Sequence, residues 1–274
     1  MIYETIQLSE KYPDCTLTSY VCDKSLPIAP RRAVIVCPGG GYGQIVAHES
    51  EVIVRKYFGA EMNVYLLRYS VGENAANFAP IIEAALAVKY VREHAEEHNT
   101  DPDKIFISGF SAGGHLAAAC GILWNSAPVR AALGIDAGEA PEGINRPNGM
   151  ILSYPVITSG KYGHLGSFKR LTGKENPTEE EMKPFSLEHH IDETTPPVFV
   201  WHTFADNVVH IKNSIILIDA LTDHGIPFEA HIYPEGIHGL SLGTVASSAN
   251  RPQKVLEHIQ TWMELSIRWI NNTK

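Results

Sequence analysis

The stretch from Ile105 to Cys120 constrains the fold of this chain more than any other part of the sequence. It begins with β-branched and aromatic residues, which are typical of a buried strand, and it ends in alanines and other small residues that favour a helix. Between the two lies a Gly-x-Ser-x-Gly motif centred on Ser111. The order of strand, sharp turn and helix predicts a serine in a strained backbone conformation where the strand ends.

The glycines beside this serine explain how such a turn can form. Gly109 and Gly113 carry no side chain, so the strand and the helix can nearly touch on either side of Ser111. The serine would lie at the amino end of the helix, whose partial positive charge favours a developing oxyanion. The motif alone is weak evidence, because in a chain with 22 glycines it also fits a helix-entry loop with an exposed serine. A nucleophile needs a donor loop before it, and an acid and a histidine after it.

Composition narrows the classes of protein that need to be considered. The 274 residues are enough for one large α/β domain, and contents of 44% hydrophobic and 19% charged residues are typical of a soluble globular protein. The net charge is −9 and no run of Lys and Arg stands out. We therefore expect neither nucleic acid nor a membrane as a partner.

The amino terminus and the cysteines point to one compartment. The chain begins without a basic segment or an apolar segment of the signal-peptide kind, and nothing approaches the length of a membrane span. Cys15, Cys22, Cys37 and Cys120 have neither metal-site spacing nor the density of a disulfide framework. We expect small apolar fillers in a reducing cytoplasm, with a Cys15–Cys22 bridge as the alternative, and we expect no metal and no cofactor.

Predicted strands alternate with predicted helices along most of the chain. Strands are expected at 2–8, 16–22, 33–37, 63–69, 105–110, 150–155, 198–203 and 228–234, and helices at 49–59, 79–97, 112–120, 210–224 and 251–270. The first two strands alternate polar and apolar residues around a Tyr-Pro-Asp turn, so they should form an antiparallel pair at a sheet edge. The rest predicts a three-layer α/β fold, with a mostly parallel eight-stranded sheet between helices.

The segment 157–197 breaks this alternation. It is long, rich in Gly, Lys, Glu and Pro, and has no clear strand. We expect one domain over 1–274, in which this segment is a small lid or specificity insertion, or else a long solvated connection with some helix.

An acid and a histidine follow two of the predicted strands, at the sheet edge where reactive groups gather. Asp206 follows the strand 198–203, and His238 follows the strand 228–234. The chain order Ser111, Asp206, His238 is the order that a serine hydrolase of this topology requires. His238 would take the proton of Ser111 and return it to the leaving alcohol, while Asp206 would hold the imidazole in the right tautomer.

Other histidines fit this role less well. His202 lies within its strand, and His115 lies one helical turn beyond Ser111, so we expect both to be structural. His189 and His190 are adjacent, but no cysteine or carboxylate around them has the spacing of a metal site.

Two other acids compete with Asp206. Asp192 lies before the strand 198–203, and Asp219 falls in the middle of a predicted helix. Neither follows the end of a strand, which is where the three groups would meet. Asp206 is therefore the predicted acid.

The loop 38–42 contains a glycine triplet directly after a buried strand and supplies the donor loop. Glycines let backbone N–H groups approach a substrate oxygen, so Gly40 and Gly41, with the N–H of Ala112, are the candidate oxyanion hole. The alternative is a plain glycine-rich turn; a phosphate loop is disfavoured because its fingerprints are missing from the sequence. The candidates to border a substrate pocket are Tyr42, His48 and Tyr154, although each could equally be packing.

Several short motifs together carry a family resemblance over about residues 35 to 240. They are Pro38-Gly39-Gly40-Gly41-Tyr42, His48-Glu49, Leu67-Arg68-Tyr69, Gly109-Phe110-Ser111-Ala112-Gly113-Gly114-His115-Leu116-Ala117, Ser153-Tyr154-Pro155, His202-Thr203 with Asp206, and Gly236-Ile237-His238-Gly239. On these residues the chain resembles α/β-hydrolases of the acetyl esterase group, which are acetyl xylan esterase-like and related to hormone-sensitive-lipase-like esterases. Pro38 departs from the pattern, since many relatives have His before the glycine triplet.

The resemblance implies the α/β-hydrolase fold and a serine esterase that removes short acyl groups, chiefly acetyl, from carbohydrates such as acetylated xylo-oligosaccharides through an acyl-enzyme. The residues themselves predict only serine-dependent acyl transfer. The alternatives are a general short-chain carboxylesterase or an arylformamidase and, from another class, a non-catalytic binding protein of the same fold. The expected partner is a small-molecule acyl ester, namely an acetylated sugar, and a homo-oligomer is left open.

Overall fold

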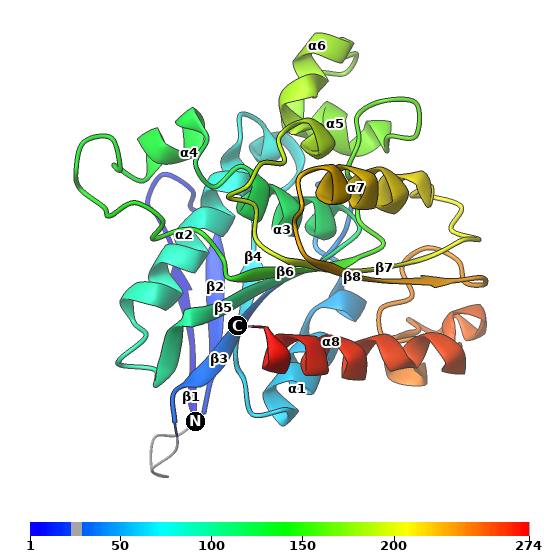
Figure 1. Ribbon diagram of the computed structural model, residues 1–274, viewed down its shortest axis with the longest axis horizontal. Coiled ribbons are helices and arrows are strands. Elements are labelled where there is room, and N and C mark those ends of the chain that lie inside the picture. The colour runs from blue at the N-terminus through cyan, green and yellow to red at the C-terminus, as the bar shows by residue number, and fades with distance from the viewer. Residues whose placement is uncertain (23–28, 274) are drawn as a thin grey trace.

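The computed structural model describes residues 1–22 and 29–273, and a single mixed sheet runs through the molecule (Figure 1). Its strands are β1 (Ile2–Gln7), β2 (Thr16–Val21), β3 (Arg31–Cys37), β4 (Asn63–Arg68), β5 (Thr100–Phe110), β6 (Gly149–Ser153), β7 (Val198–Thr203) and β8 (Phe228–Tyr233). They lie in the order β1-β2-β4-β3-β5-β6-β7-β8. The pairs β1–β2 and β2–β4 are antiparallel and the others are parallel, so the predicted eight-stranded sheet with an antiparallel N-terminal edge is confirmed.

Helices cover both faces of the sheet, as the alternation predicted (Figure 1). They are α1 (Glu51–Gly59), α2 (Ala79–Glu93), α3 (Ala112–Ile122), α4 (Ala127–Ala132), α5 (Leu165–Thr172), α6 (Glu179–Met182), α7 (Lys212–Asp223) and α8 (Thr261–Asn272). Helices α1 and α8 lie on one face, and α2, α3 and α7 lie on the other, with α4, α5 and α6 beyond them. The result is the three-layer architecture in which right-handed crossovers place helices on both sides of parallel strands.

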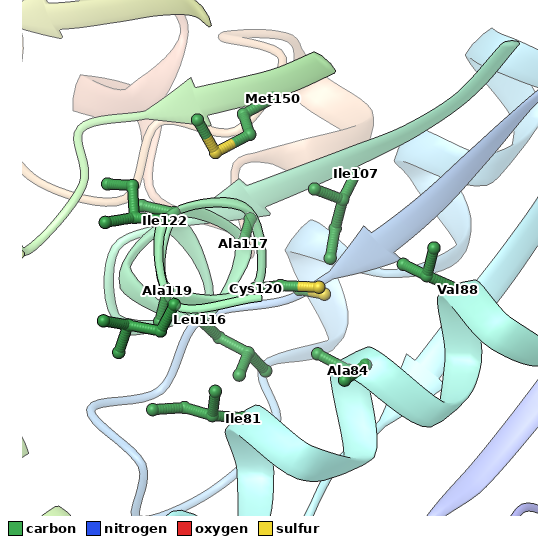
Figure 2. Close-up of a cluster of buried hydrophobic side chains, with 14 of the residues drawn as sticks. Ile81, Ala84, Val88, Ile107, Leu116, Ala117, Ala119, Cys120, Ile122 and Met150 are labelled. Atoms are coloured by element: carbon green, nitrogen blue, oxygen red, sulfur yellow. The ribbon is translucent and has the colours of Figure 1, made fainter. Parts of the chain in front are cut away.

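The helix that follows the Gly-x-Ser-x-Gly motif is buried along its whole length. Every residue of α3 is buried, and its side chains meet those of α2 while Ile107 and Met150 reach it from β5 and β6 (Figure 2). A helix that is apolar all round belongs in the centre of a protein. The turn before α3 is therefore anchored in the core.

A second apolar cluster fills the opposite face of the sheet, and aromatic rings dominate it. Trp201 of β7 stacks on Trp262 of α8, with ring centroids 5.2 Å apart, and Phe110 of β5 packs edge-on against Trp262. The indole N–H of Trp262 donates to the carbonyl of Ser241 at 2.9 Å. This cluster supports the loop that follows β8.

Three element boundaries differ from the sequence prediction by four residues or more. Helix α2 ends at Glu93 instead of 97, because Asn99 turns the chain with a φ of 47° and the N–H of Thr100 bonds the carbonyl of Ala95. Strand β5 then begins at Thr100 instead of 105. The predicted helix 251–270 was wrong for its first part, since α8 begins at Thr261 and 3₁₀ turns at Pro252–Lys254 and Glu257–Gln260 precede it.

The segment 157–197 contains α5, α6 and two 3₁₀ turns, at Lys183–Phe185 and Leu187–His189, and no strand. Helix α6 begins with a capping box between Thr178 and Glu181, a local signal that the sequence carried. The segment is also packed onto the domain, because Phe168 and Leu187 are fully buried.

The four cysteines are free, so the alternative of a Cys15–Cys22 bridge was wrong. Cys15, Cys37 and Cys120 are buried in the core as small apolar side chains, and Cys22 is half-buried. Over the part of the chain that the structure describes, no helix is both long and apolar enough to cross a membrane.

Candidate active site

Ser111 lies on a tight turn between β5 and α3. Its backbone has a φ of 55° and a ψ of −118°, a conformation that non-glycine residues rarely adopt, and its residue surface is 8% exposed. A Cβ on Gly109 would overlap the carbonyl group of Gly113, and a Cβ on Gly113 would overlap the backbone of Pro38. The predicted close approach of strand and helix is thus confirmed, and it fixes the serine in its strained position.

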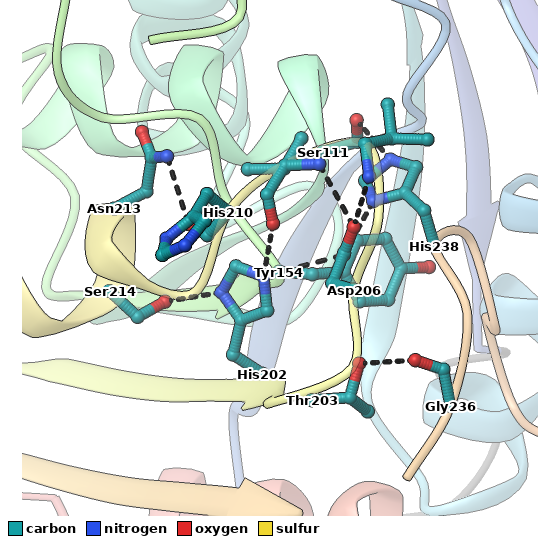
Figure 3. Close-up of polar contacts among 12 residues, drawn as sticks. Ser111, Tyr154, His202, Thr203, Asp206, His210, Asn213, Ser214, Gly236 and His238 are labelled. Carbon is teal, nitrogen blue, oxygen red and sulfur yellow. Dashed lines mark hydrogen bonds and ion pairs between the residues drawn. The ribbon is translucent and has the colours of Figure 1, made fainter. Parts of the chain in front are cut away.

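The three predicted catalytic side chains come together at the carboxyl edge of the sheet (Figure 3). Ser111 Oγ lies 2.7 Å from His238 Nε2, and His238 Nδ1 lies 2.7 Å from Asp206 Oδ2. The serine comes from the turn after β5, the acid from the loop after β7, and the histidine from the loop after β8. Both distances are those of good hydrogen bonds.

The carboxylate of Asp206 is held ionised by its surroundings. Its Oδ1 accepts the backbone N–H groups of Val208 and Val209, each at 2.9 Å. Its Oδ2 also lies 3.3 Å from His202 Nε2. Burial by itself raises the pKa of Asp206, but hydrogen bonds from His202 and His238 outweigh it and hold the pKa well below its usual value. The acid is therefore charged at neutral pH.

His202 is fully buried, as predicted for a packed core residue. Its Nδ1 lies 2.7 Å from Ser214 Oγ, and its Nε2 lies 3.0 Å from the carbonyl oxygen of Val209. The sequence did not predict the contact of His202 with Asp206, because a residue within a strand gives no sign that it reaches the loop beyond. His202 thus steadies the candidate acid.

His115 is also buried, as predicted. It lies between the hydroxyl of Tyr42 and the carbonyl of Phe185, at 2.8 Å from each. Burial lowers the pKa of His115 to about 4, so the ring is neutral at pH 7. It joins the loop after β3 to the segment 157–197.

The glycine loop after β3 lines the same cleft as Ser111. Gly40 and Gly41 have φ values of 132° and 63°, which favour glycine, and both line the cleft. Neither amide has an acceptor within the described part of the chain. The N–H of Ala112 is the first of α3 and has no acceptor inside the helix.

A buried carboxylate, that of Glu49, joins the two sides of the cleft. Its Oε2 accepts the N–H of Gly39 at 2.8 Å, and its Oε1 accepts the hydroxyl of Tyr154 at 2.7 Å. The oxygen of that hydroxyl accepts the N–H of Ser241 at 2.9 Å, and the tyrosine ring packs edge-on against His238. The sequence marks Glu49 only as part of a motif. The sequence did not reveal that Glu49 joins these two loops, because Tyr154 and His238 are distant from it in the chain.

The candidate substrate-binding residues divide into two groups. His48 lines the cleft, and its substrate-binding role stays a prediction. The prediction was wrong for Tyr42 and Tyr154, whose side chains are buried at 0% and 2% exposure and do not line the cleft. Their hydroxyl groups satisfy the buried polar groups of His115 and Glu49, so both residues are part of the framework behind the cleft.

The cleft has a volume of about 480 Å³. Besides the residues already described, it is lined by His164 and Arg170 from the segment 157–197 and by Arg251 and Lys254 from the stretch before α8. No pattern in the sequence pointed to any of these four. Among the residues that the structure describes, no group of three or more His, Cys, Asp or Glu side chains is arranged to hold a metal ion.

A mostly parallel sheet with a serine on a strained strand-to-helix turn, followed by an acid and a histidine at the same edge, defines the α/β-hydrolase class.

Comparison with known proteins points to the same class. Residues 24–141 match the BD-FAE family model, and residues 153–268 match the prolyl oligopeptidase family model. A crystal structure of an acetyl ester-xyloside bifunctional hydrolase from Caldicellulosiruptor lactoaceticus is 32% identical with a TM-score of 0.80, over 98% of this chain and 95% of that one. The chain belongs to the α/β-hydrolase family, and the resemblance to its acetyl esterase-like members is confirmed.

Two curated relatives share part of their length with this chain. The endo-1,4-beta-xylanase B of Butyrivibrio fibrisolvens is 36% identical over 215 residues, which are 77% of this chain and 33% of that protein. The acetylxylan esterase of Xylanibacter ruminicola is 26% identical over 226 residues, which are 78% of this chain and 42% of that protein. The chain thus matches a third to two fifths of each.

Proposed function

We propose that this protein is a serine esterase that hydrolyses short-chain esters, chiefly acetates, of carbohydrates such as acetylated xylo-oligosaccharides. The single observation that carries the proposal is the continuous chain of hydrogen bonds from Ser111 through His238 to Asp206. A hydroxyl in such a chain can lose its proton as it attacks an acyl carbon, which an isolated serine cannot do. The named activities of relatives, an acetylxylan esterase and an acetyl ester-xyloside hydrolase, support the choice of ester.

In the first half of the proposed reaction, Ser111 Oγ attacks the acyl carbon while His238 Nε2 accepts its proton. Asp206 stabilises the imidazolium that forms, through the hydrogen bond at Nδ1. The N–H groups of Gly40 and Gly41, with that of Ala112, would bind the oxyanion of the tetrahedral intermediate. When the intermediate collapses, His238 gives its proton to the leaving alcohol oxygen and an acyl-serine remains.

The second half repeats these steps with water as the nucleophile. His238 takes a proton from the water as it attacks the acyl-serine, and the same backbone donors bind the second oxyanion. Collapse then breaks the bond to Ser111 Oγ, which recovers its proton from His238. The acid is released and the free enzyme is restored.

The lining of the cleft supports a small acyl group. Its aliphatic side chains are Val46, Val208 and Ile237, and the remaining lining is polar or glycine. A long acyl chain would find little apolar surface to bury there. We further propose that the segment 157–197 acts as the specificity insertion, since it contributes His164 and Arg170 to the lining.

The test is a comparison of released acid from acetylated xylo-oligosaccharides, from non-sugar acetates and octanoates, and from aryl formamides. We expect the acetylated sugars to give the highest kcat/KM and octanoates the lowest. Equal rates on sugar and non-sugar acetates would indicate a general short-chain carboxylesterase, and a preference for formamides would indicate an arylformamidase. Binding of acetylated sugars without any hydrolysis would leave a non-catalytic binding protein and would refute the proposal.

A further inference from the structure

Three side chains of Arg and Lys line the candidate cleft of a protein whose net charge is −9. Arg170 reaches it from α5, and Arg251 and Lys254 reach it from the stretch before α8. His48 and His164 also line the cleft, but burial lowers the pKa of each, so they add no charge at neutral pH. The cationic character of this cleft is local.

One of the three cations has a counter-ion within the protein. Lys254 is 3% exposed, and its Nζ donates to the carbonyl of Gly239 at 2.6 Å. Lys254 Nζ, His48 Nε2 and Glu49 Oε1 all lie within 4 Å of the point where a Cβ on Gly239 would be, so the ammonium lies near the buried carboxylate. The charges of Lys254 and Glu49 therefore offset each other.

Neither arginine forms an ion pair with a carboxylate in the part of the chain that the structure describes. Within residues 1–22 and 29–273, no carboxylate lies within 4.0 Å of Arg170 or Arg251, whereas Arg130 and Lys89 form ion pairs of 2.7 Å. The guanidinium of Arg251 donates to no group in this part of the chain. Two guanidinium groups without an ion pair thus remain in the lining of the cleft, and the nearby Glu175 is paired chiefly with Lys169.

Arg170 is held in place by backbone atoms. Its Nη1 donates to the carbonyl of Gly41 at 3.2 Å and to that of Gly166 at 2.9 Å. A Cβ on Gly43 would come within 2.8 Å of Arg170 Nε, so the bare backbone of that glycine makes room for the guanidinium. An arginine fixed beside the candidate oxyanion loop keeps donors free for a second acceptor.

A second hollow adjoins the cleft at Arg170. It has a volume of about 790 Å³ and lies between α5 and the 3₁₀ turn Gly72–Ala75, with Arg170 in its lining. A short acyl group cannot need this space, but further sugar units on the alcohol side can occupy it. Arg170 therefore stands between the candidate nucleophile and the room for the rest of a substrate.

We infer that Arg170 and Arg251 form a carboxylate-binding subsite, and that the preferred substrate is an acetylated oligosaccharide that carries a uronic acid unit on the alcohol side of the ester. Guanidinium groups bind carboxylates through paired hydrogen bonds, which a neutral sugar cannot provide. The inference rests on the proposed function for its ester, but the subsite itself can be tested by binding alone.

The first experiment measures kcat/KM on acetylated xylo-oligosaccharides with and without a glucuronic acid unit. We expect a preference of about tenfold for the charged substrate, expressed mainly in KM and reduced by added salt. The double variant Arg170→Gln, Arg251→Gln should lower this ratio about tenfold, while Lys89→Gln, which removes the same kind of charge from a distant ion pair, should keep it. A hemisuccinate ester of 4-nitrophenol carries the carboxylate on the acyl side; if it alone shows the preference, the alcohol-side assignment is wrong.

The second experiment separates the subsite from the activity. Calorimetry measures binding of a glucuronic-acid-bearing xylo-oligosaccharide without acetyl groups, and of its neutral counterpart, to the full chain. Tighter binding of the charged sugar, lost in the double variant, supports the subsite whether or not any ester is hydrolysed. Equal binding and equal kcat/KM for charged and neutral sugars would overturn the subsite and leave the esterase proposal standing.

Discussion

The two sides of the candidate active site differ in the groups that they contribute: backbone groups on one side and ionisable side chains on the other. The loop after β3 and the turn after β5 contribute backbone groups, namely the N–H groups of Gly40 and Gly41 and the strained turn that holds Ser111. The loops after β7 and β8 contribute ionisable side chains, Asp206 and His238. Close packing fixes the first side, which we call the backbone side, and hydrogen bonds fix the second, which we call the side-chain side.

This difference predicts how each side responds to substitution. On the backbone side a Cβ on Gly40, Gly109 or Gly113 would overlap neighbouring backbone atoms, so even a methyl group at these positions should destabilise the fold. On the side-chain side an isosteric change keeps the packing and alters only proton positions, so activity should fall while the fold survives. Substitution of Ser111 and of Asp206 tests one side chain of the triad from each side. Substitution of Gly113, His115 and Glu49 tests the packing and the hydrogen bonds that hold the two sides in place.

Ser111→Ala should have the largest effect on activity. We expect hydrolysis of 4-nitrophenyl acetate to fall by about 10⁴-fold or more, because the nucleophile is gone and only binding and oxyanion stabilisation remain. The rate is measured from released 4-nitrophenolate, and unchanged thermal unfolding serves as the control for folding. Equal rates in the two proteins would remove the enzyme hypothesis altogether.

Asp206→Asn should come next, with a loss of about 10³- to 10⁴-fold in kcat. An amide N–H₂ facing His238 Nδ1 would favour the tautomer with its proton on Nε2, which cannot accept the proton of Ser111. Asp219→Asn, an exposed change on α7, is the matched control. A variant that retains most of its activity would show that another group orients the imidazole.

The contrast between the two sides also decides what could be predicted from the sequence. Strand order, the antiparallel edge and the turn at Ser111 depend on local patterns of apolar residues and glycines, and these were predicted. Asp206 and His238 were found because each follows a strand directly. The end of α2 was missed because a turn at Asn99 closes the helix early. The start of α8 was missed because the chain before it bonds the loop after β8, as in the bond between the N–H of Leu256 and the carbonyl of Gly243.

The support of the site was largely invisible in the sequence. Glu49 bonds Tyr154, which is 105 positions away, and Arg170 bonds Gly41 across 129 positions. No spacing rule links residues so far apart, since only the folded sheet brings their loops together. Tyr42 and Tyr154 were assigned to the pocket because aromatic residues near catalytic motifs fit either role, and burial alone distinguishes the two.

Gly113→Ala tests the packing of the backbone side. The new methyl group would overlap the backbone of Cys37 and Pro38, so we expect a loss of about 3 kcal/mol or more in the free energy of unfolding. Gly59→Ala, in α1, is the matched control, because a Cβ there meets nothing within 4 Å and should stabilise by up to about 1 kcal/mol. Urea unfolding measures both. Similar stabilities for the two variants would contradict the close approach of β5 and α3.

The backbone side should also weaken in acid, through His115. Its pKa is about 4 in the folded protein, whereas the ordinary value for histidine is 6.5, so between these values the unfolded chain binds more protons. The neutral His115 ring makes its full contribution to the free energy of unfolding above pH 6.5. This contribution is lost as the pH falls to about 4, and the loss is at most about 3 kcal/mol. Urea unfolding at about pH 7.5 and about pH 4.5 should show a smaller loss for His115→Gln than for the unchanged protein. An equal loss in both would mean that His115 does not stay neutral in the fold.

Glu49→Gln should have the smallest effect and is the most direct test of how the two sides are joined. A glutamine can accept the N–H of Gly39 or the hydroxyl of Tyr154 through its one oxygen, but its N–H₂ group would face the other donor. We expect kcat to fall about tenfold or more with little change in KM, because the donor loop and the histidine loop lose their common support while the cleft lining stays in place. Tyr154→Phe removes the same bond from the other end and also the acceptor of the Ser241 N–H, so its effect should be at least as large. The double variant should cost little more than Tyr154→Phe alone, since both changes break the connection between Glu49 and Tyr154. Glu51→Gln, on the exposed surface of α1, is the control for the lost charge. If the effects of Glu49→Gln and Tyr154→Phe instead multiply, the two residues act separately, and the backbone and side-chain sides are positioned independently of each other.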